Sequence, residues 1–367
     1  MARYLGNAWY VAAWSSEVGR SLLARTIIER PILLYRKQSG EAVAIGNMCP
    51  HRFAPLSKGK LIDDVVQCGY HGLRFGSTGE CVLNPHHDGK LPPKMRVPSY
   101  AVVERHNMIW LWMGEDAQAA DASKIPDFSC HTDPSLAFVG GLIEMKANYE
   151  LISDNLLDLA HAEFVHEGIL SSEAITQSKL ETTQNGTTIY SNRWCPNGEP
   201  APAWKMAFDD YDKPVDHFIY MRWDAPAHML LDVGVCPVGG TRDEGVWVYG
   251  TDVITPKDEY NSYYFWAVTR GYKPGDPAAD EFWRRSIKLA FEGQDEPMIE
   301  AQQQMLGTRS LQEMRPMLFS VDAAAARARR ILAELIAQDA TPRPVNPNLA
   351  ELRKTAAQSC NPVAPGV

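Results

Sequence analysis

The sequence predicts a two-domain protein of the α+β class. Short β-rich runs separated by turns fill residues 7–114, and longer strand patterns and helical patterns come only after that point. The later strand patterns lie at residues 229–235, 246–254 and 263–269, and the closing helical patterns lie at residues 278–305 and 321–338. Because the strands cluster and the helices follow them, we expect the helices to pack on one side of an antiparallel sheet.

The first domain is assigned to residues 1–116 and is predicted to be all-β. Its strand patterns lie at residues 9–13, 26–28, 32–35, 43–45, 102–103 and 109–112. Residues 115–124 then become polar and alanine-rich, so residues 117–139 are predicted to form a linker.

The second domain is assigned to residues 140–340. It opens with a strand, continues through a helical stretch at 149–166, and carries a hairpin signal at Asn185-Gly186. Residues 341–367 are polar and rich in proline, so we expect this tail to be loosely ordered or draped over another subunit.

Composition narrows the class of partner. The chain has 367 residues, of which 45% are hydrophobic, and a net charge of −9. No run of lysine and arginine forms the basic face that nucleic acid or an anionic membrane requires, and the apolar runs are too short to span a bilayer. No signal pattern opens the chain, which predicts a cytoplasmic protein with reduced cysteines.

Two short peptides carry the strongest signal in the chain, Cys49-Pro50-His51 and Cys68-Gly69-Tyr70-His71. Each peptide supplies one thiol and one imidazole, and a Rieske [2Fe-2S] cluster is held by two of each. The alternative is a structural Cys2His2 zinc site, but zinc fingers pair Cys with Cys and His with His, whereas here the two types alternate. The two cysteines and two histidines are therefore predicted to hold a Rieske cluster.

A second candidate metal site lies in the helical stretch, where His161 and His166 stand among apolar residues together with the carboxylate of Asp158. Two histidines and one carboxylate form the facial triad of non-haem Fe(II) oxygenases. On an ideal helix His161 and His166 point about 140° apart, so both reach one metal only if the helix ends or bulges between them. The alternative is a pair of hydrogen-bonded core histidines.

The third ligand of this site must come from elsewhere in the chain. Asp295 is the first choice, because Pro297 would kink the helix close to it. Glu292 and Glu296 are weaker candidates, and all three carboxylates could instead lie on a solvated helix face.

These residues resemble a known family, the oxygenase components of Rieske non-haem iron aromatic oxygenases, and within it the O-demethylase group that includes the vanillate and dicamba enzymes. The likeness extends nearly from end to end. The motifs that carry it are Asn7-Ala8-Trp9-Tyr10-Val11-Ala12, Cys49-Pro50-His51-Arg52, Ala54-Pro55-Leu56-Ser57, Tyr70-His71-Gly72-Leu73 and Asp154-Asn155-Leu156-Leu157-Asp158-Leu159. The resemblance implies an N-terminal Rieske domain and a C-terminal catalytic domain of helix-grip, START-like fold.

The resemblance also implies roles for single residues. His161, His166 and Asp295 would bind mononuclear Fe(II), and Asn155 would line that site. Asp158 would link the two metal sites across a subunit boundary in a head-to-tail homotrimer.

The function implied is O2-dependent O-demethylation of a methoxylated aromatic acid such as vanillate, with release of formaldehyde. No GxGxxG follows a strand and no further four-cysteine set is present, so electrons from NADH must arrive through a separate flavin and iron–sulfur reductase, directly or through a ferredoxin. Two alternatives stay open, namely hydroxylation of another aromatic or alicyclic substrate by the same iron, and a non-enzymatic Rieske electron carrier.

The sequence defines the substrate-binding residues less well. His228 lies among apolar residues of a predicted strand and could hydrogen-bond a phenol or carboxylate, the alternative being a buried core histidine. Other polar side chains on predicted strands of this domain are Arg193, Arg222, Arg270 and Tyr220. For each arginine the alternative is a surface ion pair.

Overall fold

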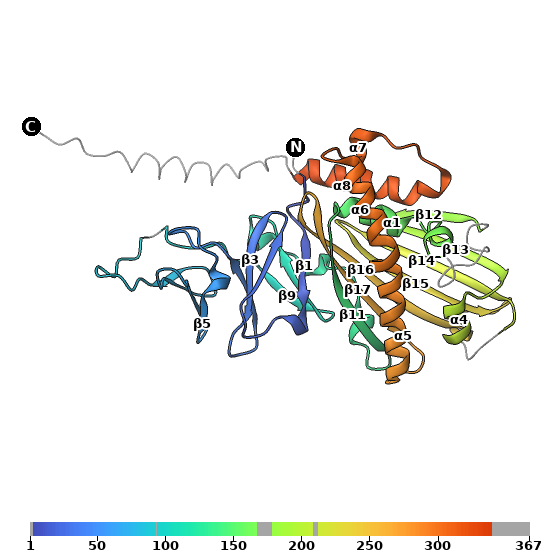
Figure 1. The fold of residues 1–367 in the computed structure, drawn as a ribbon, viewed down its shortest axis with the longest axis horizontal. Helices are drawn as coiled ribbons and strands as arrows, with labels where there is room; N and C mark the ends of the chain where they lie inside the picture. The colour runs from blue at the N-terminus through green and yellow to red at the C-terminus, as the bar shows by residue number, and fades with distance from the viewer. Residues whose placement is uncertain (1–2, 93, 167–177, 208–211, 340–367) are drawn as a thin grey trace, which may run out of the picture.

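The computed structural model describes residues 3–92, 94–166, 178–207 and 212–339, and Figure 1 shows how they are arranged. Three small antiparallel sheets form one end of the molecule, and a seven-stranded antiparallel sheet with helices on it forms the other. The predicted α+β class is therefore confirmed, with an all-β part followed by a sheet-and-helix part.

The N-terminal part consists of strands and turns. Its sheets have the strand orders β1-β10-β9, β2-β3-β4 and β5-β6-β7-β8. The strands are β1 Trp9–Trp14, β2 Leu23–Ile27, β3 Arg30–Arg36, β4 Ala42–Gly46, β5 Lys60–Ile62, β6 Val65–Gln67, β7 Arg74–Phe75, β8 Cys81–Leu83, β9 Val102–Arg105 and β10 Met108–Trp112. All six predicted strands overlap observed ones. Strands β5 to β8 were not predicted, because runs this short leave no alternation to detect.

The C-terminal part is organised around one sheet with the strand order β11-β17-β16-β15-β14-β13-β12, in which all neighbours are antiparallel. Its strands are β11 Ala137–Met145, β12 Leu180–Asn185, β13 Thr188–Gly198, β14 Val215–Asp224, β15 His228–Pro237, β16 Val246–Asp258 and β17 Asn261–Arg270. The predicted hairpin at Asn185-Gly186 joins β12 to β13, and Gly186 takes the left-handed conformation that such a turn requires, with φ of 59°.

Helices lie over one face of this sheet and above one end of it, where α7 and α8 are seen (Figure 1). They are α1 Tyr149–Leu157, α2 Ala162–Val165, α4 Pro202–Ala207, α5 Pro277–Ile287, α6 Glu296–Leu306, α7 Leu311–Met314 and α8 Ala323–Asp339. A π-helical stretch, Lys288–Asp295, joins α5 to α6. The helix predicted over residues 278–305 is therefore present as one continuous helix whose central turns are π-helical. This run crosses the sheet and forms a wall over it.

The expected linker at residues 117–139 is a packed segment and not a loose tether. Strand β11 already begins at Ala137, and the short helical turns before it bury Ile125 and Phe128, which are 5% and 0% exposed. The ring of Phe128 stacks on Trp110 of β10 with 6.2 Å between ring centroids. Apolar anchors inside a polar stretch therefore fix how the two parts of the chain meet.

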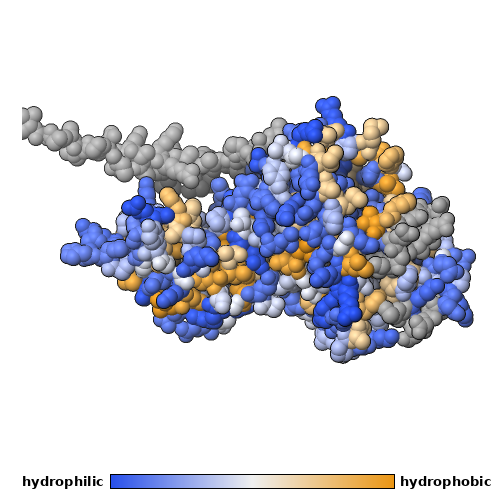
Figure 2. All heavy atoms as spheres, viewed as in Figure 1, coloured by the Kyte–Doolittle hydropathy of each residue, from blue (hydrophilic) through white to orange (hydrophobic). Residues whose placement is uncertain are grey.

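Hydrophobic and hydrophilic residues are mixed over the face shown in Figure 2. Several large apolar side chains are nonetheless well exposed near α7, namely Met305, Met314, Met317, Leu318 and Phe319. Clustered exposed apolar side chains of this kind are typical of contact surfaces.

No helix within the described residues is long and apolar enough to cross a bilayer. The predicted tail at 341–367 lies outside the described residues.

Candidate metal centres and substrate cavity

The first candidate centre lies in two loops, one after β4 and one after β6. The thiols of Cys49 and Cys68 are buried, with residue exposures of 1% and 2%. The imidazole rings of His51 and His71 lie side by side in an edge-to-face arrangement, with 4.6 Å between their centroids. The loops thus bring the two thiols together and the two imidazoles together, and this donor set fits a Rieske cluster.

Close backbone packing keeps these loops tight. The N–H of Gly72 donates to the carbonyl oxygen of Cys68 at 3.1 Å, and Gly72 has a φ of 73°. A Cβ atom added at Gly69 would lie 2.7 Å from the carbonyl oxygen of Lys58. Glycine is therefore required at both positions, which supports the close approach expected around a compact cluster.

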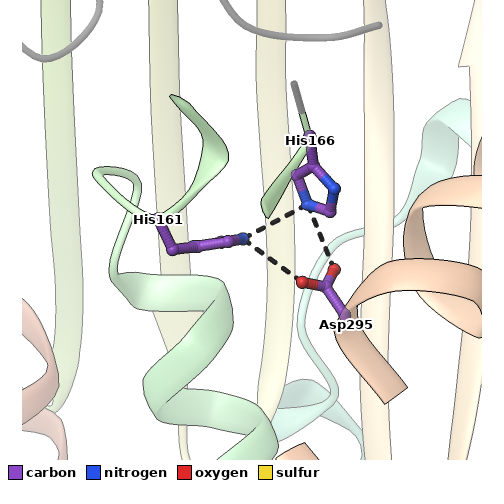
Figure 3. A group of neighbouring side chains, drawn as sticks. All are labelled: His161, His166 and Asp295. Atoms are coloured by element: carbon purple, nitrogen blue, oxygen red, sulfur yellow. Dashed lines mark hydrogen bonds and ion pairs between the residues drawn. The ribbon is translucent and has the colours of Figure 1, made fainter. Parts of the chain in front are cut away.

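The second candidate centre is formed by His161, His166 and Asp295, which point toward one another (Figure 3). The Nε2 atoms of the two histidines lie 3.3 Å apart. The carboxylate oxygens of Asp295 lie 3.5 Å from Nε2 of His161 and 3.2 Å from Nε2 of His166. His166 and Asp295 are 3% and 2% exposed, so three donor atoms converge in a buried position that could hold a metal ion.

The helix that leads to this centre ends earlier than the sequence suggested. Helix α1 stops at Leu157, and Asp158 leaves the helical conformation with φ of −88° and ψ of 84°. His161 lies in the following turn, and His166 lies directly after the short helix α2. Helix α1 therefore ends before His161, α2 ends between the two histidines as predicted, and this arrangement lets both imidazoles face one point.

This break also changes how Asp158 acts on His161 within the chain. The Asp158 carboxylate is not paired with the His161 imidazole in the described structure, because α1 ends before it. The backbone carbonyl of Asp158 instead accepts from Nδ1–H of His161, while the carboxylate accepts the N–H of Ala160 at 3.0 Å. His161 is therefore oriented by main chain, and the Asp158 side chain is only partly buried.

Asp295 is presented by the widened helix. It is the last residue of the π-helical stretch, and the N–H of Glu296 bonds to the carbonyl of Phe291, as a π-helical turn requires. Pro297 follows Glu296 and has no backbone N–H to donate to the hydrogen-bond ladder of a regular helix. The predicted distortion near Asp295 is therefore present, and π-helical turns are frequent at functional sites.

Two amides support the three donor groups. Gln294 accepts a hydrogen bond from Nδ1–H of His166 at 2.9 Å, which leaves Nε2 free to face the centre. Nδ2 of Asn155 donates to the Asp295 carboxylate at 3.3 Å, which places Asn155 beside the centre as expected. Burial lowers the pKa of His166, but the Asp295 carboxylate and Gln294 together raise it by more, so the net shift is upward.

A cavity opens beside this centre between the sheet and the helical run. It has a volume of about 140 Å³ and reaches from the three donor groups to Trp204 and Trp283. Besides those groups, the lining residues are mainly apolar, and the further polar side chains among them are His217 and Asp252. The hydroxyl of Tyr264 donates to Asp252 at 2.6 Å.

The structure corrects the placement of His228. This histidine is 1% exposed and does not line the cavity in the described structure. Its Nε2 bonds to the carbonyl oxygen of Trp9 at 3.0 Å, and its ring packs edge-on against Trp110 at 5.2 Å between centroids. Its contacts are those of a core histidine at the junction of the two parts, because the strand turns this side chain toward the N-terminal sheets.

Sequence reasoning missed Gln294, His217, Asp252 and Tyr264. Gln294 had a signal in its position next to Asp295, since ligand histidines require an acceptor for their second nitrogen. The sequence signal for Asp252 was weaker: a carboxylate within an apolar strand pattern is expected to be buried, and a buried carboxylate needs a hydrogen-bond or charge partner. Nothing in the local sequence indicates which face of β16 meets the helices.

Comparison with known proteins places both parts of the chain. Residues 8–101 match the Rieske [2Fe-2S] domain, and residues 145–338 match the vanillate O-demethylase oxygenase C-terminal domain. The oxygenase component of chloroacetanilide N-alkylformylase from Rhizorhabdus wittichii is 37% identical, over 93% of this chain and 98% of that protein. The oxygenase component of dicamba O-demethylase from Stenotrophomonas maltophilia is 36% identical, over 90% of this chain and 98% of that protein.

Solved structures agree with this assignment. Dicamba monooxygenase bound to dicamba has a TM-score of 0.86 and 36% identity, over 92% of this chain and 99% of that one. A dicamba monooxygenase structure that contains non-haem iron has a TM-score of 0.81, 36% identity and the same coverage. The chain therefore belongs to the Rieske non-haem iron oxygenases, in the family of the vanillate and dicamba O-demethylase oxygenase components, and is an enzyme of that family.

Proposed function

We propose that this chain is the cytoplasmic terminal oxygenase component of a Rieske monooxygenase that O-demethylates a methoxylated aromatic compound. The observation that carries the proposal is the buried triad of His161, His166 and Asp295 at the wall of an apolar cavity. In this proposal the triad holds mononuclear iron, with Asn155 beside it. The proposed Rieske ligands are Cys49, His51, Cys68 and His71.

When bound, the iron supplies O2 activation and the Rieske cluster supplies single electrons. One oxygen atom of O2 enters a methyl C–H bond of the ether, and the hemiacetal so formed collapses to a phenol and formaldehyde. The other oxygen atom leaves as water, with two electrons and two protons. The chain's own residues bind the aromatic ring against Leu231, Val248 and Phe291 and direct its methyl group toward the triad.

A second candidate is removal of an alkyl group from nitrogen by the same chemistry. It is supported by the 37% identity to the oxygenase component of a chloroacetanilide N-alkylformylase, which is level with the 36% identity to that of dicamba O-demethylase. Both reactions yield an aldehyde from the alkyl group, so aldehyde identity and the dealkylated ring product separate them.

Electrons are proposed to come from a separate NADH-dependent reductase and to cross between subunits of a homotrimer. Within one chain, β5, which lies close in sequence to the cluster loop after β6, is at the left end of the molecule in Figure 1, whereas α1, which leads to the triad, lies over the sheet of the C-terminal part. A neighbouring subunit could bring its cluster close to the triad instead. Asp158 is partly exposed beside the triad and is the proposed link between the two centres.

The test is turnover with a surrogate reductase, NADH and a panel of methoxylated aromatic compounds that includes vanillate, with formaldehyde as the readout. Stoichiometric formaldehyde supports O-demethylation, whereas a hydroxylated ring without aldehyde supports the alternative hydroxylase. Iron analysis separates both from a mere electron carrier, since an oxygenase should hold about three iron atoms per chain and a carrier about two.

A further inference from the structure

The cavity beside the triad has an unusual balance of charge for an enzyme that would bind an aromatic acid. Among the described residues that line it, there is no lysine and no arginine. The polar side chains outside the triad are a histidine, His217, and a carboxylic acid, Asp252. Burial lowers the pKa of His217 to about 4, so its imidazole is neutral at physiological pH.

Other cationic side chains could come from the segments outside the described residues or from described residues that do not line the cavity. The segments 167–177 and 208–211, which lie outside the described residues, contain no lysine, arginine or histidine. The buried guanidinium of Arg193 on β13 does not line the cavity, and it interacts electrostatically with Cys195 and Asp158. A substrate carboxylate would therefore enter the cavity without a counter-charge from these side chains.

Burying an unpaired carboxylate in an apolar site is strongly unfavourable. A bound Fe(II) ion would keep one net positive charge beside Asp295, and that charge would lie at the triad and not along the apolar walls of the cavity. Asp252 supplies no positive charge in either protonation state. The charge balance of the cavity thus disfavours benzoates and sulfonates and favours uncharged compounds.

Asp252 is placed to bind such a compound through a polar group. Val248, Gly250 and Asp252 alternate along β16 and all line the cavity. Within the described residues, Tyr264 is the hydrogen-bond partner of Asp252 and occupies Oδ1. The other oxygen, Oδ2, lies 3.8 Å from where a Cβ atom on Gly250 would stand, and the Cβ of Leu231, another lining residue, lies 3.3 Å from the same point.

We propose that the cavity selects an electrically neutral aromatic substrate, and that Asp252, positioned by Tyr264, accepts a hydrogen bond from an N–H or O–H group of that substrate. This inference rests on the proposed function and specifies its substrate class. It replaces the aromatic acid that the sequence suggested. Apolar walls with one oriented polar group are the usual means by which such cavities fix a ligand.

Binding can be measured apart from turnover, by titration calorimetry on the oxidised holoenzyme. The ligands are matched pairs, a methoxybenzoate and the methoxybenzamide with the same ring pattern, together with methoxybenzene, which has no N–H or O–H group. We expect at least one amide to bind at least about tenfold tighter than its acid and than methoxybenzene. Equal or tighter binding of the acids, or failure of every amide to bind, would overturn the proposal.

Variants assign the effect to Asp252. Asp252→Asn should lower the ratio of amide to acid affinity by about tenfold, since it replaces the acceptor for the substrate N–H with an amide whose own N–H can donate to an acid. Asp232→Asn is the matched control, because Asp232 lies on the neighbouring strand β15, pairs with Arg242 and does not line the cavity. If both variants keep the wild-type ratio, Asp252 does not determine specificity. The wild-type acid and amide comparison remains decisive even if Asp252→Asn does not fold.

Tyr264→Phe tests the positioning role. The Asp252 carboxylate would stay but lose the donor that orients it, so amide binding should weaken severalfold while methoxybenzene binding stays unchanged. A parallel loss for both ligands would point to a general packing defect instead.

Formaldehyde assays distinguish failure of this inference from failure of the proposed function. Efficient demethylation of acids but not of amides would overturn the neutral substrate class and leave the O-demethylase intact. Tight, Asp252-dependent binding of amides without any aldehyde product would leave the specificity intact and overturn the reaction.

Discussion

Gln294 accepts a hydrogen bond from Nδ1–H of His166 at 2.9 Å. Gln294 directly precedes Asp295, so the neighbour of one triad residue orients another triad residue. The two are far apart in the sequence and meet because the π-helical stretch turns both Gln294 and Asp295 toward the end of α2. A single distortion in one helix therefore provides both a donor group and the support for its neighbour.

Replacing Gln294 by methionine should reduce iron retention without unfolding the protein. The substitution preserves length but removes the acceptor that fixes the tautomer and the ring orientation of His166, and loss of such support typically costs about 10- to 100-fold in metal affinity. Equilibrium dialysis against a graded chelator measures this. Gln302→Met, on the exposed side of α6, is the matched control and should retain iron like the wild type. Equal retention in both variants would contradict the supporting role of Gln294.

The two metal centres should be separable by mutation. His161→Ala or His166→Ala should abolish turnover and leave the visible spectrum of the cluster intact, because the proposed cluster ligands lie in loops of the N-terminal sheets. Absorption spectroscopy and an oxygen-consumption assay check both statements. Loss of the cluster spectrum in both histidine variants would contradict the assignment of two sites.

The converse variant is Cys68→Ser. It should remove the cluster and destabilise the N-terminal part, since metal binding supplies much of the folding free energy of small metal sites. Cys195→Ser, which alters a buried cysteine of the C-terminal sheet, is the control and should stay coloured. A stable, coloured Cys68→Ser protein would show that Cys68 is not a ligand.

Buried neutral histidines should make the protein sensitive to mild acid. Burial lowers the pKa of His131, His217 and His228 to about 4, from an ordinary value of 6.5. Below pH 6.5 the unfolded chain binds protons that the folded chain does not, so the free energy of unfolding falls as the pH drops from 6.5 toward 4.

For a single histidine this slope can be isolated. His228→Gln removes the titrating ring, so its free energy of unfolding should fall less steeply than that of the wild type between pH 6.5 and 5, by up to about 1.4 kcal/mol per pH unit. Urea unfolding followed by tryptophan fluorescence provides the comparison, with the exposed His87→Gln as control. Because His228 does not line the cavity, the Michaelis constant should not change; a large increase would restore a substrate-binding role.

The sequence predicted the parts of the molecule that are encoded locally. The cluster peptides, the hairpin turn and the pair His161 and His166 each need only a few neighbouring residues to be read, and Asp295 could be chosen because Pro297 marks a distortion. The fold class followed from strand and helix periods. These signals act within one element and do not depend on tertiary packing.

The features that were not predicted depend on which face of a strand or helix packs against which other element. His228 and Asp252 both lie in strand patterns dominated by apolar residues, yet one side chain turns toward the N-terminal sheets and the other lines the cavity. Alternation along a strand fixes which residues share a face but not what packs on that face. The helix end at Leu157 was likewise set by the conformation of Asp158, which an apolar helical pattern does not reveal.

The last prediction concerns the path of the electrons. Asp158→Asn should retain both metal centres, because its carboxylate accepts the N–H of Ala160 and does not touch the triad, yet turn over slowly if this carboxylate joins the triad to a neighbour's cluster. Iron analysis and the visible spectrum establish that both centres are present. Wild-type turnover by Asp158→Asn would remove Asp158 from the path.

Mixed trimers test the path directly. Subunits with Cys68→Ser keep the triad but lose the cluster, and subunits with His161→Ala keep the cluster but lose the iron, so neither parent is active alone. In a head-to-tail ring, every mixed trimer contains one junction where an intact cluster faces an intact triad, and random equal mixing should therefore restore about a quarter of wild-type activity. Native mass spectrometry verifies the mixed rings. If verified mixed rings stay inactive, transfer is confined to single chains, because only transfer between subunits can combine the two intact centres.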